Sequence, residues 1–229
     1  MTPDRPSLLS SPLTRVFLSI ALLTAMMIGL GLLITHRLAH LWPLALEDQA
    51  VRAVVAERTP TLDRVSNVVS LIAYTQGLAL AMIVVGCAMR IVYHRWREFF
   101  FLAAAMLAQL EMFSITARVV ARHRPPVRRL DDFPVMQSFP SGHTAAAVAL
   151  YGGIAVILAM HARRKTHAAV WWVLLLLIPI AVAISRVYRG MHYPSDDAAS
   201  FIGALACLWI LQRAMLNPVE QTPSRDTDA

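Results

Sequence analysis

The sequence predicts an all-α integral membrane protein, a bundle of six transmembrane helices with a small interfacial amphipathic segment between helices one and two. Two observations carry this prediction. Hydrophobic residues make up 57% of the 229 residues and charged residues only 15%, whereas about 25% of the residues of a soluble domain are charged. The mean hydropathy of +0.56 comes from long apolar runs, and about 20 apolar residues cross a bilayer as a helix.

Six apolar runs bounded by charge or proline are predicted to span the membrane. The first is longer than the apolar region of a usual signal peptide and lacks a clear small-residue cleavage site, so we expect a retained helix. We expect a cytoplasmic N-terminus over 1–15, a six-helix membrane domain over 16–216 and a polar, disordered tail over 217–229. The predicted spans are 16–35, 67–89, 99–117, 144–160, 168–184 and 197–215.

Basic residues set the expected orientation. The net charge is +7, and its positive residues cluster between apolar runs, which favours orientation in an anionic bilayer over binding of nucleic acid. The N-terminus and the loops at 90–98 and 161–167 are expected on the cytoplasmic side. The loops at 36–66, 118–143 and 185–196 then lie on the opposite side, and the mixed charged and apolar pattern of 36–66 predicts the interfacial segment.

The loop at 118–143 is rich in arginine although the alternation places it outside the cytoplasm. Its Arg124 and the Arg186 that follows the fifth span can each bind two phosphate oxygens through a guanidinium fork. The backbone amides of Ser141 and Gly142 precede the fourth span, where a helix N-terminus favours an anion. Arg122, His123, Arg128 and Arg129 are expected to attract anionic lipid headgroups in general; the alternative is direct contact with the substrate.

Two histidines and a carboxylate lie in the same two loops as these arginines. His143 begins the fourth span, and His192 and Asp196 lie between the fifth and sixth. One imidazole can attack phosphorus while the other protonates the leaving oxygen. Asp196, four residues after His192, is placed to fix the imidazole tautomer as a triad carboxylate does. The residues therefore predict phosphoryl transfer to a histidine.

These segments resemble the motifs of the type 2 phosphatidic acid phosphatase superfamily, which are K-x6-R-P, P-S-G-H and S-R-x5-H-x3-D. The second motif is complete over 140–143 and the third over 185–196. The first keeps Arg124 and Pro125 but has Ala117 where the family has lysine. Arg118, one position later, is a further candidate for the role of that lysine; the alternative is a structural ion pair with Glu111.

The resemblance implies a membrane lipid phosphatase with no metal and no other cofactor. His192 would be the nucleophile, Asp196 its orienting partner and His143 the general acid. The phosphate oxygens would be held by Arg124, Arg186, Ser141 and Gly142.

The expected partners are a lipid phosphate or diphosphate and the bilayer, with no nucleic acid. The expected location is a bacterial inner membrane, with cytoplasmic termini and a site facing the periplasm or exterior. The alternatives are a lipid phosphotransferase with the same intermediate and a small transporter.

Overall fold

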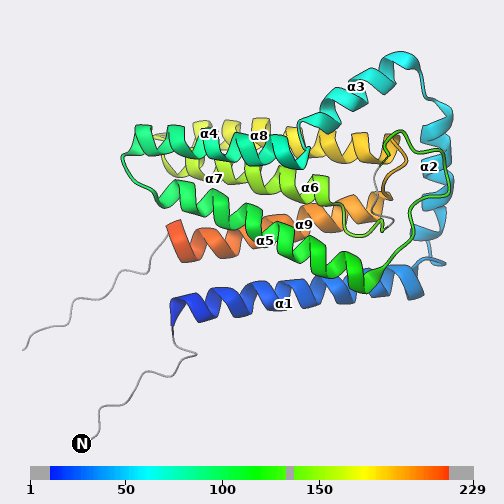
Figure 1. The fold of residues 1–229 in the computed structure, drawn as a ribbon, viewed down its shortest axis with the longest axis horizontal. Coiled ribbons are helices and arrows are strands. Elements are labelled where there is room, and N and C mark those ends of the chain that lie inside the picture. The colour runs from blue at the N-terminus through cyan, green and yellow to red at the C-terminus, as the bar shows by residue number, and fades with distance from the viewer. Residues whose placement is uncertain (1–10, 133–136, 217–229) are drawn as a thin grey trace, which may run out of the picture.

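Long helices run along one axis and are capped at one end by two shorter helices (Figure 1). The computed structural model describes residues 11–132 and 137–216. Residues 1–10 and the predicted tail at 217–229 lie outside the described part of the chain. Within the described part, six helices are long and apolar enough to cross a membrane, which confirms the predicted class and number of spans.

The six spans are made from seven α-helices, because a π-helical turn at Val148–Gly152 divides the fourth span into two. The first span continues through a π-helical turn at Ile34–Leu38, and the sixth through one at Gln212–Leu216. The helices are α1 (Pro12–Leu33), α4 (Thr75–Tyr93), α5 (Arg97–Val120), α6 (Gly142–Ala147), α7 (Gly153–Met160), α8 (Lys165–Tyr188) and α9 (Pro194–Leu211).

The segment between the first two spans forms α2 (Glu47–Ala56) and α3 (Pro60–Leu71). The second span was predicted to begin at residue 67, but residues 67–71 belong to α3 and the span begins eight residues later. Helix α3 turns Ser66 and Ser70 toward α8, where Ser66 carbonyl accepts from Ser185 and Ser70 hydroxyl accepts from Arg186. Its apolar side chains, including Val65 and Val68, are exposed. The amphipathic segment thus presents its polar face to the bundle.

The core of the bundle lies between α5, α6, α7 and α9. Phe101 and Leu102 of α5 are fully buried there. Small residues allow the close approach of the helices: a Cβ atom added to Gly152 would lie 2.9 Å from Leu208, and one added to Gly153 would lie 2.8 Å from Leu102. Large apolar side chains of α1, α4 and α8 are exposed instead, as expected of helices that face lipid.

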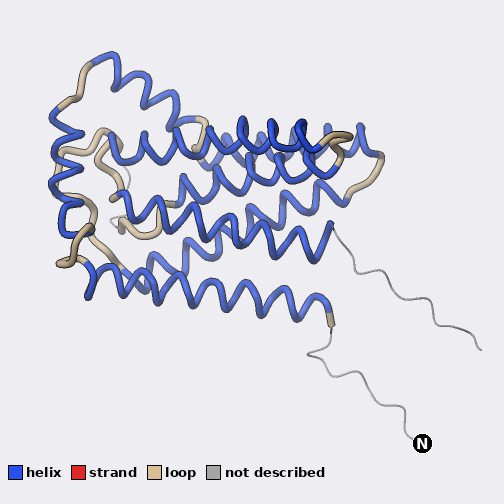
Figure 2. The backbone as a smooth tube through the Cα atoms, turned by 180° about the vertical axis from the view of Figure 1, so that it is seen from behind, coloured by secondary structure: helices blue, strands red, loops and turns tan. Residues whose placement is uncertain are grey.

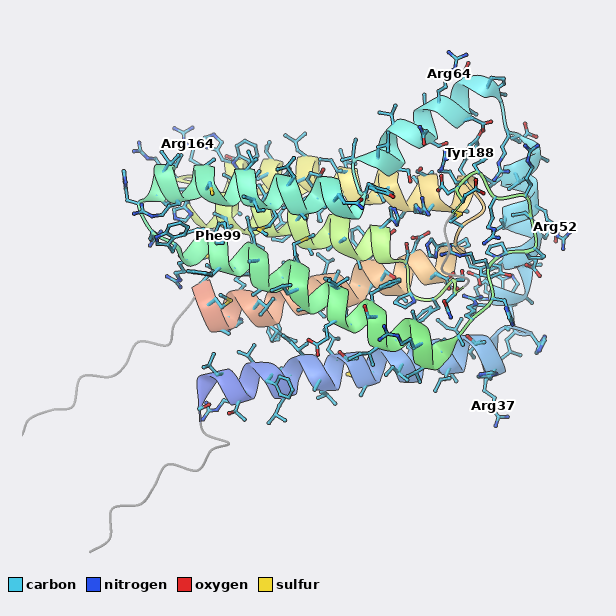
Figure 3. The ribbon with its side chains drawn as sticks, viewed as in Figure 1. Arg37, Arg52, Arg64, Phe99, Arg164 and Tyr188 are labelled. Atoms are coloured by element: carbon cyan, nitrogen blue, oxygen red, sulfur yellow. The ribbon has the colours of Figure 1, made fainter. Side chains whose placement is uncertain are left out.

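The two ends of the bundle differ. Helix α1 begins and α9 ends at one end, where Figure 3 also places Arg164. At the other end α2 lies across the long helices, as both views of the backbone show (Figure 1 and Figure 2). Arg37, Arg52 and Arg64 project at this capped end, and Tyr188 marks the end of α8 beneath the cap (Figure 3).

Candidate active site

The predicted site residues come together at the capped end. Helix α8 ends at Tyr188, and Gly190 reverses the chain with φ +71°, a left-handed conformation suited to glycine after a helix. A Cβ atom at Gly190 would lie 2.8 Å from Val127, so the turn packs against the loop that follows α5. Pro194 is then the first residue of α9, a position where proline is favoured. His192 is held between these two fixed helix ends.

A cavity of about 290 Å³ opens beside this turn and extends between α4 and α5. Its polar end is formed by Arg124, Gly142, His143, Arg186 and His192. Its other walls are almost entirely apolar and come from α4, α5 and α6. Five of the seven predicted site residues, drawn from three segments of the chain, thus line one cavity that continues as an apolar channel.

The Arg186 guanidinium is buried, with 2% of the residue exposed. Its Nη1 donates to the Ser70 hydroxyl at 2.6 Å and to the Asp131 carboxylate at 2.7 Å. Its Nε is buried and has no hydrogen-bond partner among the described residues. Arg186 is therefore fixed from one side and retains a donor for an anion in the cavity.

Arg124 lines the same cavity and donates to the carbonyl oxygen of Met191. Burial lowers its pKa to about 10, with the positive charges of Arg186 and Arg129 acting in the same direction. The guanidinium remains charged at neutral pH. Two cations thus lie on the same cavity, and an anion bound between them would relieve their repulsion.

His192 is 3% exposed, and its Nδ1 lies 2.6 Å from the carbonyl oxygen of Ser138. A carbonyl can only accept, so Nδ1 carries the proton and Nε2 keeps its lone pair. Burial lowers the pKa of the imidazole well below its ordinary value, and the charges of Arg124 and Arg186 add to this effect. The ring is neutral at physiological pH, as a nucleophile requires.

Asp196 does not bond directly to His192, which differs from the expectation of a triad. Its Oδ2 lies 3.9 Å from the His192 Nδ1. The fully buried carboxylate instead accepts from the Ser138 hydroxyl, from the Tyr193 backbone amide at 2.9 Å and from Arg122. The reason is that α9 begins at Pro194, so the turn between residues 192 and 196 is not helical throughout. Asp196 reaches His192 through Ser138, whose carbonyl holds the imidazole.

Arg122 is a structural residue, in contrast to the expectation that it attracts lipid headgroups. It is 8% exposed, bonds to Asp196 and to Glu47 at 2.9 Å, and stacks over Tyr193 with its guanidinium carbon 4.2 Å from the ring centre. Glu47 also accepts from the Ser195 backbone amide at 2.7 Å. Burial lowers the pKa of Arg122, but Asp196 and Glu47 outweigh it and raise the pKa overall. This cluster ties α2 to the start of α9.

Ser141 and Gly142, at the start of the fourth span, have different positions. The Ser141 backbone amide donates to the Ser200 hydroxyl at 2.7 Å, and the residue is fully buried. It is not among the lining residues of the cavity, so the amide expected to bind phosphate is used by the fold. Gly142 does line the cavity, where a Cβ atom would lie 3.1 Å from the Phe113 ring. Glycine leaves the backbone open to a ligand there.

The first motif remains incomplete in three dimensions. Ala117 is 5% exposed and turned into the bundle, whereas Arg118 is exposed one position further round α5. Arg118 lines neither the cavity at His143 and His192 nor the second cavity at His143. Within the described residues no ion pair joins it to Glu111, so neither of its predicted roles is found.

A second cavity of about 250 Å³ meets the first at His143 and Arg186. Its walls are polar and come from α3, Tyr74 and the loop after α5. Asp131 lines it and binds both Arg186 and the Nε of Arg189, the latter at 2.9 Å. Burial raises the pKa of the Asp131 carboxyl, but Arg189 and Arg186 lower it by more. The pKa therefore lies below its ordinary value. His143 therefore lies between an apolar and a polar cavity.

Four residues that shape the site were not singled out from the sequence for these roles. They are Glu47, Asp131, Ser138 and Arg189. Arg189 follows the third motif's arginine by three residues, close to one helical turn, which was a usable signal. The partners of the other three lie more than fifty residues away in the chain, so no local pattern marks them.

The all-helical membrane bundle, with two arginines and two histidines around a cavity at one end, defines a membrane enzyme that handles phosphate. The chain belongs to the PAP2 superfamily, whose family model matches residues 98–219. The match covers more than half of the chain and confirms the resemblance predicted from the two complete motifs. The protein is thus a membrane lipid phosphatase of the PAP2 type.

Two curated relatives are similar in sequence. Phosphatidylglycerophosphatase B of Bacillus subtilis (strain 168) is 26% identical over 170 residues, which cover 72% of this chain and 81% of the relative. The bacitracin transport permease protein BcrC of Bacillus licheniformis is 34% identical over 91 residues, covering 39% of this chain and 40% of the relative.

Two solved structures share the fold. The transmembrane PAP2-type phosphatidylglycerolphosphate phosphatase from Bacillus subtilis matches with a TM-score of 0.74 and 21% identity, over 92% of this chain and 98% of that one. The LpxE structure from Aquifex aeolicus matches with a TM-score of 0.56 and 21% identity, over 76% of this chain and 98% of that one.

Proposed function

We propose that the protein hydrolyses a lipid phosphomonoester or diphosphate through a phosphohistidine on His192, without a metal, at the extracytoplasmic face of a bacterial inner membrane. One observation carries the proposal: His192 keeps its Nδ1 proton on the Ser138 carbonyl while it lines a cavity with Arg124 and Arg186. The free Nε2 lone pair and the two cations are what attack on a bound phosphate requires.

In the first step the Nε2 of His192 attacks phosphorus. The new P–N bond forms as the P–O bond to the lipid breaks. His143, which the negative charge of the bound phosphate favours in its protonated form, gives its proton to the leaving lipid oxygen. Arg124 and Arg186 stabilise the charge on the phosphoryl oxygens. In the second step His143 takes a proton from water, the water oxygen bonds to phosphorus, and the P–N bond breaks. Phosphate leaves and both histidines return to their first states.

The two cavities support separate routes for lipid and water. The apolar cavity runs from the catalytic residues between α4 and α5, which diverge toward the capped end (Figure 1). A lipid tail can remain in an apolar environment along this route. The polar cavity meets it at His143 and Arg186 and gives water a path to the phosphohistidine. Such access favours hydrolysis over transfer to a second lipid.

The activity of one relative supports a lipid phosphate as substrate. One is a phosphatidylglycerophosphatase and shares 26% of its aligned residues with this chain. The candidate substrates are phosphatidic acid, phosphatidylglycerol phosphate, a polyprenyl diphosphate and a lipid A phosphate. They share a terminal phosphate on an apolar anchor.

The test is phosphate release from these four lipids by the purified full chain in detergent or nanodiscs, with a chelator present throughout. We expect turnover of at least one lipid and loss of more than about a thousand-fold in His192→Ala. His123→Ala is the matched control, because His123 lies outside the cavities. Wild-type chain incubated with labelled lipid should yield acid-labile, base-stable phosphoprotein. Full activity in folded His192→Ala would refute the proposal.

A further inference from the structure

One polar side chain lies in the apolar wall of the lipid cavity. Gln109 of α5 is 3% exposed, and neither its Oε1 nor its Nε2 has a hydrogen-bond partner among the described residues. It is the one polar residue among those that α5 contributes to this wall, which are Ala103, Met106, Leu107, Gln109, Leu110 and Phe113.

An unpaired amide in this position opposes folding. Within a membrane span no bulk water replaces the missing bonds. The Cys207 thiol of α9 lies near Gln109, but a thiol is a weak partner and makes no bond of normal geometry here. Leucine or methionine would fill the same space without leaving two polar atoms unpaired. The amide therefore needs a partner that residues 11–132 and 137–216 do not supply, and the cavity is where such a partner would bind.

The depth of Gln109 indicates what that partner is. Phe113 packs against Gly142, the neighbour of His143, and so marks the level of the catalytic residues on α5. Gln109 lies four residues earlier on the same face, about 6 Å further into the bundle. A lipid whose phosphate is at the histidines thus passes Gln109 roughly one helical turn below its phosphate.

We propose that the Nε2 of Gln109 donates a hydrogen bond to an acyl carbonyl of the substrate, so that the enzyme selects acylated lipid phosphates. The inference rests on the proposed function and names the substrate class of that site. In phosphatidic acid the ester carbonyls follow the phosphate within a few bonds. A polyprenyl diphosphate has only hydrocarbon at this depth, and its binding would leave the amide unpaired.

Matched lipids test the proposal. Diester and diether phosphatidic acids with the same chains differ in the two carbonyls and share the phosphate. We expect wild type to prefer the diester in kcat/KM by roughly three- to ten-fold, as for one net hydrogen bond. The preference should lie mainly in KM, because the bond is kept throughout the reaction. In Gln109→Met the ratio should fall to about one, whereas Leu110→Met, which alters the same wall, should keep it.

Stability is a second readout. Gln109→Met removes two unpaired polar atoms, so its thermal midpoint in detergent should equal or exceed that of wild type. A marked loss of stability would show that Gln109 serves the fold and would overturn the inference; Gln109→Leu repeats this measurement with a second apolar side chain.

The kinetic outcomes separate the two proposals. An equal rate on both lipids in wild type, or a diester preference retained in Gln109→Met, overturns the inference alone. No turnover of any lipid phosphate by wild type overturns the proposed function and the inference with it.

Discussion

Arg186 and Asp131 form an ion pair at 2.7 Å at the junction of the two cavities. The same carboxylate binds Arg189, so Asp131 fixes Arg186 and also cancels part of its charge. A dianionic phosphate that reaches Arg186 therefore meets a guanidinium that is already partly neutralised. The ion pair sets how strongly the resting site attracts an anion.

Asp131→Asn should strengthen inhibition by inorganic phosphate. The amide keeps an acceptor for Arg189 but removes one negative charge near the bound anion, which we expect to lower the inhibition constant about five-fold. The measurement is phosphate inhibition of lipid turnover at low and at high salt, and the effect should shrink at high salt. Asp132→Asn, which removes the same charge one residue away, should have a smaller effect. Equal effects of the two variants would contradict a special role for the Arg186 pair.

His192 should remain neutral well into the acidic range. Burial lowers its pKa, and Arg124 and Arg186 lower it further; a lowered pKa means that protonation begins only at a pH below the ordinary value. In protein labelled with ¹⁵N-histidine, the His192 ring should keep the neutral Nδ1–H tautomer as the pH is lowered through about 6.5, the ordinary pKa of histidine. His192→Gln identifies its resonances by their loss. In Arg124→Gln the titration should move to higher pH, because one repelling charge is gone. Titration of wild-type His192 near its ordinary pKa would contradict the burial argument.

The helices and the polar end of the cavity were predictable because their signals are local. Apolar run length identified all six spans, and motif spacing identified His143, His192, Arg124 and Arg186. The start of the second span was missed because hydropathy does not fall where α3 ends. Residues 68–73 are mostly apolar and contain neither proline nor glycine, so the break between α3 and α4 has no local marker.

The contacts that hold the site could not be predicted because they join distant segments. The partner of Arg122 on α2, Glu47, is 75 residues away in the chain. The carbonyl that fixes His192 belongs to Ser138, 54 residues away, and a backbone carbonyl leaves no trace in the residue type. The triad-like spacing of four residues suggested Asp196 as the partner of the His192 imidazole instead. Only the start of α9 at Pro194 decides between Asp196 and the Ser138 carbonyl as that partner.

Arg122 and Arg118 should differ sharply although they are four residues apart. Arg122→Ala would leave Glu47 and Asp196 buried without their cation, which costs about 3–5 kcal/mol. We expect a large drop in the thermal midpoint in detergent, and low recovery of folded protein. Arg118 is exposed, so Arg118→Ala should keep both the midpoint and the rate of lipid turnover. A loss of turnover in folded Arg118→Ala would show that Arg118 does replace the missing lysine of the first motif.

Two exposed arginines at opposite ends of the bundle, Arg52 on the cap and Arg164 beside the start of α8, allow its orientation to be tested (Figure 3). The basic loop around Arg164 is expected in the cytoplasm, and the site beneath Arg52 is expected outside. With Cys87 and Cys207 replaced by alanine, a membrane-impermeant maleimide added to intact spheroplasts should label Arg52→Cys at once. Arg164→Cys should react only after the membrane is permeabilised. The reverse pattern would place the site in the cytoplasm, where a lipid substrate would have to be presented from the inner leaflet.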